Sequence, residues 1–180
     1  MSSSLMPRRA FSTSSVCSPS SGAGERTAPG VSDILGMWIA APGDIWFSGK
    51  SGIVRHRKPT GEWETAPSFT TADLPSIWGR NDHDIWTMRD SHTAYHYDGA
   101  TWKPLVIPST VELQSIHSIA GSGSVDVWAV GQLGIAIHWD GVTWSQDATN
   151  TRDDLNAIWL SPDGSGHAVG RLGTMLRHRP

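Results

Sequence analysis

The chain has 180 residues, enough for one domain, with 38% hydrophobic residues and a formal net charge of −3. This charge produces no field of one sign that would favour nucleic acid or an anionic membrane surface as a partner. The single cysteine, Cys17, excludes an internal disulfide, and no apolar run approaches the roughly 20 residues of a membrane helix. We therefore expect a fold held together by packing, with no membrane insertion.

Residues 1–32 are rich in Ser, Pro and Gly and poor in apolar side chains. Such a composition cannot bury enough surface to offset the entropy lost on ordering, so we predict a disordered leader. The segment lacks the apolar stretch of a secretory signal, whereas "RRAFSTSS" (8–15) is similar to an organellar transit peptide. A solvated tail, a misplaced start codon and organellar import are the three interpretations.

A unit of about 40 residues recurs from residue 33 onward, and repeats of this length are typical of propellers and solenoids. The leading apolar residues of the four copies are 40, 39 and 42 residues apart: Ile34, Leu74, Leu113 and Leu155. The copies span 33–72, 73–111, 112–153 and 154–180, and the last one lacks its final part. These units predict one repeat domain over 33–180.

Each unit is predicted to form four short strands. The second strand carries a Trp in three units (Trp46, Trp86 and Trp128), and the fourth strand opens on a Trp in the same units (Trp63, Trp102 and Trp144). Asp-Gly pairs precede two of these fourth strands and favour tight hairpins, because Gly adopts positive φ angles without strain. The pairs are Asp98-Gly99 and Asp140-Gly141.

No window of useful length has helical periodicity, so the fold class is all-β. A four-stranded sheet cannot bury both faces alone, and stacking such sheets around an axis gives a β-propeller. A large Trp side chain suits the wedge-shaped gap between neighbouring blades. Three complete blades and a partial fourth predict an open arc or a fragment of a larger propeller. The alternative is a four-bladed ring in which the leader supplies the missing strand.

Three recurring motifs carry a resemblance to a known family: an L-x-x-I opener, A-V-G-x-x-G at 129–134 and 168–173, and D-G-x-x-W at 98–102 and 140–144. The units resemble blades of Asp-box/BNR-type β-propellers. They are most similar to photosystem II assembly-factor-like proteins and to Trp-rich repeats of bacterial extracytoplasmic proteins. The resemblance covers 33–180 and implies a propeller, with an extracytoplasmic bacterial location. It departs from the sialidase Asp-box, S-x-D-x-G-x-x-W, because Asp and Gly are adjacent here.

Histidines recur in the third strand with separations of 40, 42 and 40 residues: His56, His96, His138 and His178. A ring of imidazoles could bind a metal or an anion. However, third strands lie away from a propeller axis, so their side chains cannot converge, and we expect a repeated structural hydrogen bond or packing partner. His117 and His167 stand where other units have Trp. No metal site is predicted.

Acidic residues also recur before the second strand, at Asp44, Asp84 and Asp126. We expect these side chains to lock the preceding turn through local hydrogen bonds, rather than to form a carboxylate ring. The turns could also hold a divalent cation weakly, although solvation of these side chains is the preferred interpretation. The residues of such a site would be His83 and His92 with Asp82, Asp84 and Asp90.

Catalytic motifs are missing from the sequence, which has no G-x-S-x-G, H-E-x-x-H, P-loop or G-x-G-x-x-G. No carboxylate pair or arginine triad is marked either, so we assign no catalytic residue and no cofactor. The predicted function is a non-catalytic binding or scaffold module for a protein or glycan partner. Self-association through open terminal blades is a further possibility. The alternatives are part of a sialidase-like glycoside hydrolase and, from the resemblance, an assembly factor for a membrane complex.

Overall fold

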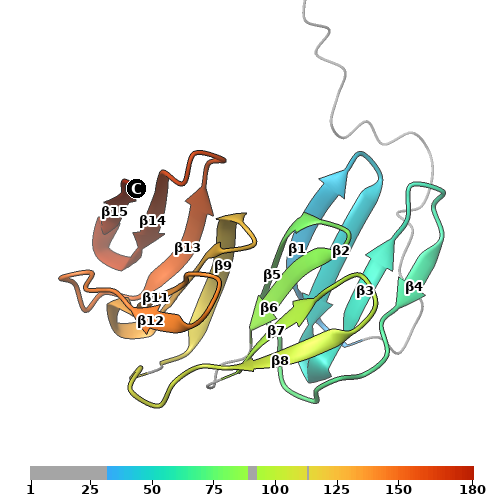
Figure 1. The fold of residues 1–180 in the computed structure, drawn as a ribbon, viewed down its shortest axis with the longest axis horizontal. Helices are drawn as coiled ribbons and strands as arrows, with labels where there is room; N and C mark the ends of the chain where they lie inside the picture. The colour runs from blue at the N-terminus through green and yellow to red at the C-terminus, as the bar shows by residue number, and fades with distance from the viewer. Residues whose placement is uncertain (1–31, 89–92, 113) are drawn as a thin grey trace, which may run out of the picture. The chain divides into compact units, whose positions relative to one another are not determined.

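The computed structural model describes residues 32–88, 93–112 and 114–180, and these residues form fifteen β-strands and no α-helix (Figure 1). The all-β prediction is therefore confirmed. Cys17 and the predicted leader, apart from Ser32, lie outside the described residues. Within the described part of the chain, no helix has the length and apolar character needed to cross a membrane.

The strands form four antiparallel sheets, and each sheet consists of strands that are consecutive in the chain. We call these sheets blades 1 to 4. Blade 1 contains β1 (Ile34–Ala41), β2 (Asp44–Gly49), β3 (Val54–Arg57) and β4 (Trp63–Thr65). Blade 2 contains β5 (Ser76–Asn81), β6 (Asp84–Met88), β7 (Thr93–Tyr97) and β8 (Trp102–Val106). Blade 3 contains β9 (Ile116–Gly123), β10 (Asp126–Gly131), β11 (Ala136–Trp139) and β12 (Trp144–Gln146). Blade 4 contains β13 (Leu155–Leu160), β14 (Gly166–Gly170) and β15 (Met175–His178).

Successive blades lie side by side through their first strands, with β5 between β1 and β9, and β13 beside β9 (Figure 1). The hydrophobic core consequently lies between blades. Trp46 and Ile85 belong to the cluster shared by blades 1 and 2, and Trp86 and Trp144 to the larger cluster shared by blades 2 and 3. This arrangement is the predicted stack of propeller blades.

Each Trp of a second strand packs against an aromatic ring of the next blade. The ring centroids are 5.7 Å apart for Trp46 and Tyr97, 5.7 Å for Trp86 and Trp139, and 4.7 Å for Trp128 and His178. These contacts recur because the three second strands have the same place in their sheets. They give the recurring Trp residues the wedge-filling position that the sequence predicts.

A second contact between blades pairs a large residue with a small one. An added Cβ on Gly79 would lie 2.8 Å from the ring of Trp38, and one on Gly121 would lie 2.6 Å from the ring of Trp78. At the interface between blades 3 and 4 the small residue and the large residue exchange places. Ala120 of blade 3 has the position of the Trp, and Leu160 of blade 4, with which it clusters, has the position of the Gly. Blade spacing is thus maintained by complementary volumes.

The A-V-G-x-x-G motif forms a 3-10 turn between the second and third strands. In the turn of blade 3, Leu133 has a φ of 52° and Gly134 a φ of 73°. A Cβ on Gly134 would lie only 2.3 Å from the carbonyl oxygen of Thr151, so both the backbone angle and the close approach require Gly. The Leu133 N–H donates to Asp154 Oδ1 at 3.0 Å, which ties the turn to the next blade.

The third unit begins three residues later than the repeat spacing places it. The pairs Ile34 with Gly49, Ile116 with Gly131, and Leu155 with Gly170 are equivalent, so Ile116 is the leading residue. The assignment of this position to Leu113, which lies outside the described residues, is therefore wrong. The motif is ambiguous here because Leu113-x-x-Ile116 and Ile116-x-x-Ile119 both fit the opener.

The same register corrects the position assigned to His117. Trp38 lies opposite Trp46, but in blade 3 the residue opposite Trp128 is Ala120 and not His117. His117 instead has its Nδ1 3.0 Å from the carbonyl oxygen of Leu155, in the next blade.

The outer faces of the two end blades carry exposed apolar side chains. Met37 is 58% exposed and Ile39 is 56% exposed on blade 1, while Trp159 is 61% exposed and Met175 is 70% exposed on blade 4. The equivalent positions in inner blades are covered by a neighbour. The described blades therefore form a stack with two uncovered ends.

We predict that Trp86→Ala lowers the free energy of unfolding by about 3–5 kcal/mol, because the Trp86 ring is only 2% exposed and its removal leaves a cavity between blades. Urea unfolding followed by circular dichroism measures the change. Trp159→Ala is the matched control, and it should change stability by no more than about 0.5 kcal/mol. Equal effects of the two substitutions would contradict this packing.

Candidate binding grooves between the blades

A Trp, a His and an Asp form one cluster on the same face of blade 2. The Asp84 Oδ1 accepts hydrogen bonds from Trp86 Nε1 at 2.8 Å and from His96 Nε2 at 2.8 Å. The imidazole of His96 also stacks on the indole, with ring centroids 4.2 Å apart. All three side chains are therefore held by one another and by the sheet.

Blades 1 and 3 repeat this cluster with one difference. His56 and His138 bond to Asp44 and Asp126 at 2.6 and 2.8 Å, and they stack on Trp46 and Trp128 at 4.1 and 4.4 Å. Trp128 Nε1 donates to Asp126 at 2.9 Å, whereas the buried Nε1 of Trp46 has no partner among the described residues. The recurring His and Asp residues thus pair within each blade.

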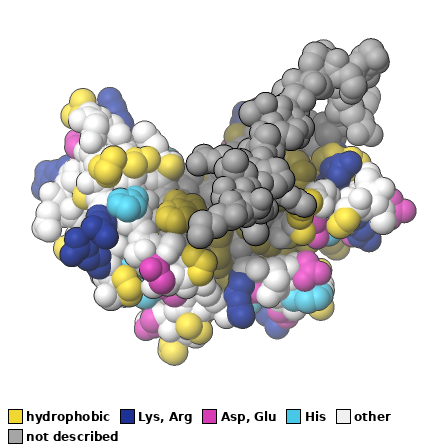
Figure 2. Space-filling model, turned by 90° about the horizontal axis from the view of Figure 1, so that it is seen from above, with side chains coloured by type: hydrophobic (Ala, Val, Ile, Leu, Met, Phe, Trp, Pro, Cys, Tyr) yellow, Lys and Arg dark blue, Asp and Glu magenta, His cyan; other side chains and the backbone are white. Residues whose placement is uncertain are grey.

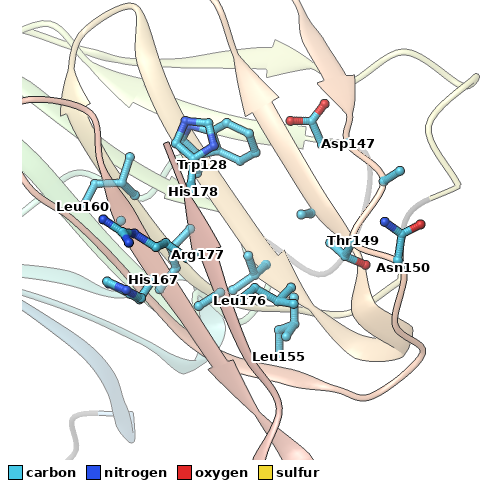
Figure 3. A pocket seen from close by; sticks show the side chains of 16 residues that line it. Trp128, Asp147, Thr149, Asn150, Leu155, Leu160, His167, Leu176, Arg177 and His178 are labelled. Carbon is cyan, nitrogen blue, oxygen red and sulfur yellow. The ribbon is translucent and has the colours of Figure 1, made fainter. Parts of the chain in front are cut away.

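His178 does not have the same position as the other three histidines. Arg177 lies opposite His167 in blade 4, just as His96 lies opposite Trp86 in blade 2, so the prediction is wrong by one residue. His178 instead projects toward Trp128 of blade 3 (Figure 3). Counting from the turn Gly exposes the shift, since seven residues separate Gly131 from His138 and eight separate Gly170 from His178.

The Asp-Gly pairs lie in the hairpins between third and fourth strands. Asp98 Oδ1 accepts from the N–H groups of Ala100 and Thr101 at 3.0 and 2.9 Å, and Gly99 has a φ of 91°. Asp140 and Gly141 form the same turn, in which Asp140 accepts from Val142 and Thr143 at 2.8 Å. Lys103 beside Asp98, with the two backbone donors, holds the pKa of that carboxyl well below its usual range.

No three His, Cys, Asp or Glu side chains lie together as a metal site within the described ranges. Of the residues that could hold a cation weakly, Asp90 and His92 lie outside these ranges. His83 is exposed beside Asp82, with 3.5 Å between Nε2 and Oδ1. The described residues therefore present packing and turn interactions at these positions.

A groove of about 530 Å³ lies between blades 1 and 2. Its aromatic walls are Trp46, Phe69, Tyr97 and Trp102, and residues 64–69, from the end of β4 into the segment that follows it, also line it. Phe69 stacks on Trp102 with centroids 4.7 Å apart and an interplanar angle of 15°. Sequence reasoning missed this groove, because part of its lining comes from a connecting segment that belongs to no repeated motif.

A second cavity, of about 300 Å³, lies between blades 3 and 4 (Figure 3). Trp128 and Ala136 line it from blade 3, and Leu155, Leu176 and His178 line it from blade 4. Polar and charged side chains complete the lining, among them Asp147, His167 and Arg177. Figure 2 shows hydrophobic, basic and acidic side chains interspersed on one face of the molecule.

No protein-family model matches the chain, and no curated protein matches it. Among solved structures, the chain is similar to a YCF48 bound to D1 peptide, with 19% identity and a TM-score of 0.64 over 84% of this chain. It is also similar to YCF48 from Cyanidioschyzon merolae, with 18% identity and a TM-score of 0.67 over 82% of this chain. The chain spans about half the length of each, 51%. At this identity the similarity establishes the β-propeller fold, and it does not establish the Asp-box type of repeat.

We predict that the free energy of unfolding falls as the pH drops below about 4, the pKa range of an Asp in the unfolded chain. Burial raises the pKa of Asp84, but its hydrogen bonds with His96 and Trp86 outweigh burial, so the folded-state pKa is lowered. The contribution of Asp84 to stability is therefore fully present at a pH above the pKa of this carboxyl in the unfolded chain. It is lost as the pH falls through the pKa of the same carboxyl in the folded chain.

Asp84→Asn should therefore be less stable than the parent at neutral pH and should lose less stability on acidification. Urea unfolding at neutral and acid pH measures the difference. An unchanged pH dependence in the variant would show that this carboxyl is not held in its charged form by its partners.

Proposed function

We propose that the chain is a non-catalytic β-propeller module that binds a peptide segment of a protein partner in the groove between blades 1 and 2. The observation that carries this proposal is the groove itself. Its volume of about 530 Å³ and its aromatic and small polar lining suit a short run of side chains. Ala100 and the exposed Thr101, from the hairpin between β7 and β8, also line it.

The arrangement of the rings favours a peptide over a glycan. Sugar binding needs an exposed aromatic face, but Phe69 and Trp102 cover each other, and His56 covers Trp46 at 4.1 Å with an angle of 11°. The groove therefore offers ring edges and aliphatic surface, which suit apolar peptide side chains. The fold similarity to a YCF48 bound to D1 peptide is consistent with a peptide ligand.

The positive charges on the outer faces of blades 1 and 4 argue against self-association through these blades. The outer face of blade 1 carries Arg55 and Arg57, in register with the apolar Phe47 and Ile45. The outer face of blade 4 carries Arg177 beside the exposed Met175. Direct stacking of these faces would bring like charges together. A role as a glycosidase fragment has no support, whereas the fold similarity to a YCF48 bound to D1 peptide supports a protein-binding or assembly-factor role.

We predict that the full chain, used as bait for a random peptide display library, selects peptides that bind with saturation. Thr101→Trp should weaken binding by at least about tenfold, because a large ring at the groove edge excludes the ligand. Thr143→Trp is the matched control, since Thr143 has the same place in the hairpin of blade 3. It should bind like the parent.

A glycan array with the same three proteins tests the alternative. Saturable glycan binding that Thr101→Trp abolishes, together with no selected peptide, would replace the peptide proposal with carbohydrate binding. Peptide binding that is equal in all three proteins would locate the site elsewhere.

A further inference from the structure

The interface between blades 2 and 3 provides a comparison for the groove between blades 1 and 2, because all three blades have four strands. Trp102 and Trp144 have the same position, since each begins a fourth strand and lies opposite the last aromatic residue of the third. Trp144 is 2% exposed, whereas Trp102 is only partly buried. The second interface therefore encloses a ring that the first leaves partly open.

A small residue at the groove replaces a large one at the next interface. The Ala66 N–H donates to the Val54 carbonyl at 2.9 Å, and Leu105 lies opposite Ala94. Val54 and Ala94 have the same place in their third strands, so Ala66 is equivalent to Leu105. Leu105 packs against the core cluster shared by blades 2 and 3, whereas Ala66 lines the groove. Asp147 has this position in blade 3, which faces blade 4.

The next alternate position shows the same difference in size. Ile107 follows Leu105 by two residues, is 1% exposed and belongs to the same core cluster. Val106 between them is 78% exposed, so the two buried side chains point to the same side of the chain. The residue two positions after Ala66 is Ser68, which is exposed and lines the groove. Two aliphatic side chains of one interface thus have small counterparts in the other.

The connection to the next blade is also shorter at the groove. From Ala66 to Leu74 the chain advances eight residues, and from Leu105 to Ile116 it advances eleven. The longer connection contributes Val111, which is 3% exposed, to the core cluster of its interface. The shorter connection therefore brings less aliphatic volume to the interface between blades 1 and 2.

The polar side chains of the groove are already engaged with other groups. His56 Nε2 lies 2.6 Å from Asp44 Oδ1, and Glu64 forms an ion pair with Lys58. The Tyr97 hydroxyl donates to a carbonyl of its own hairpin at 3.0 Å. Among the described residues, the lining thus presents no unpaired charge, and apolar ligand side chains suit it better than charged ones.

We propose that the groove selects an extended peptide segment with two aliphatic side chains, of the size of Leu or Ile, at alternate positions. This inference rests on the peptide-binding function proposed above and adds the specificity of the same site. One side chain fills the space beside Ala66 and the other the space beside Ser68. Side chains at alternate positions of an extended peptide lie on one face, about 6.5–7 Å apart. Pro67 disfavours a helical conformation at Ala66, so the two groove residues belong to an extended segment as well.

The test begins with the peptides that the full chain selects from the random display library. We expect two aliphatic residues at positions i and i+2 to be enriched among them relative to the unselected library. Ala66→Leu fills the first space, as Leu105 does at the next interface, and should weaken binding of the selected peptides at least about tenfold. Asp147→Leu is the matched control, because it makes the same change at the equivalent position of blade 3, and it should bind them like the parent.

One selected peptide is then synthesised with a fluorescent label, and its binding is measured by anisotropy. Replacing either aliphatic residue of the peptide by Ala should weaken binding to the parent at least about tenfold. In the Ala66→Leu chain, the same replacement at the residue that fills this space should weaken binding no more than about twofold, because the space is already occupied. If circular dichroism shows that Ala66→Leu does not fold, Ser68→Ile makes the corresponding test at the second, exposed position.

The outcomes separate this inference from the proposed function. Peptides that Thr101→Trp excludes, but that lack the aliphatic pair, would overturn the inference and leave peptide binding in the groove intact. The same conclusion would follow if the peptides kept their affinity for both Ala66→Leu and Ser68→Ile. If no peptide is selected, or if Thr101→Trp does not weaken binding, the proposed function fails and the inference fails with it.

Discussion

The contact on which the structure depends is the indole of a second strand held between two rings. Trp86 stacks on His96 of its own blade at 4.2 Å and packs against Trp139 of the next blade at 5.7 Å. The stacking on His96 fixes the indole within its own sheet, and the contact with Trp139 joins two neighbouring sheets. Because a single blade cannot bury its faces alone, the indole links local strand formation to the stacking of blades.

Blade 4 departs from this pattern at all three positions of the cluster. Ser165, His167 and Arg177 replace the Asp, Trp and His of blades 1 to 3, so the indole and the carboxylate of the cluster are both missing from its outer face. The opposite face, toward blade 3, keeps its apolar residues Leu155, Ala168 and Leu176. The cavity between blades 3 and 4 is therefore lined by the same apolar residues that form this blade interface.

Much of the fold could be predicted from spacing, because strands, turns and Trp positions recur at about 40 residues and each has a local physical cause. The spacing alone could not predict which residues of two repeats are structurally equivalent. Two overlapping copies of the opener made Leu113 as plausible as Ile116, and the triplet Arg-His-Arg at 177–179 matched 55–57 with a shift of one residue. The groove was beyond prediction because Phe69, in the segment between blades 1 and 2, stacks on Trp102 and belongs to no repeat motif.

The most direct test of the account is a double-mutant cycle between Trp86 and Trp139, which belong to neighbouring blades. The free energies of unfolding of Trp86→Leu, Trp139→Leu and the double variant are measured by urea titration. If the two rings couple the blades, the cycle should give an interaction energy of about 0.5–1.5 kcal/mol. Additive effects of the two substitutions would contradict the account, because the rings would then stabilise their own blades without joining them.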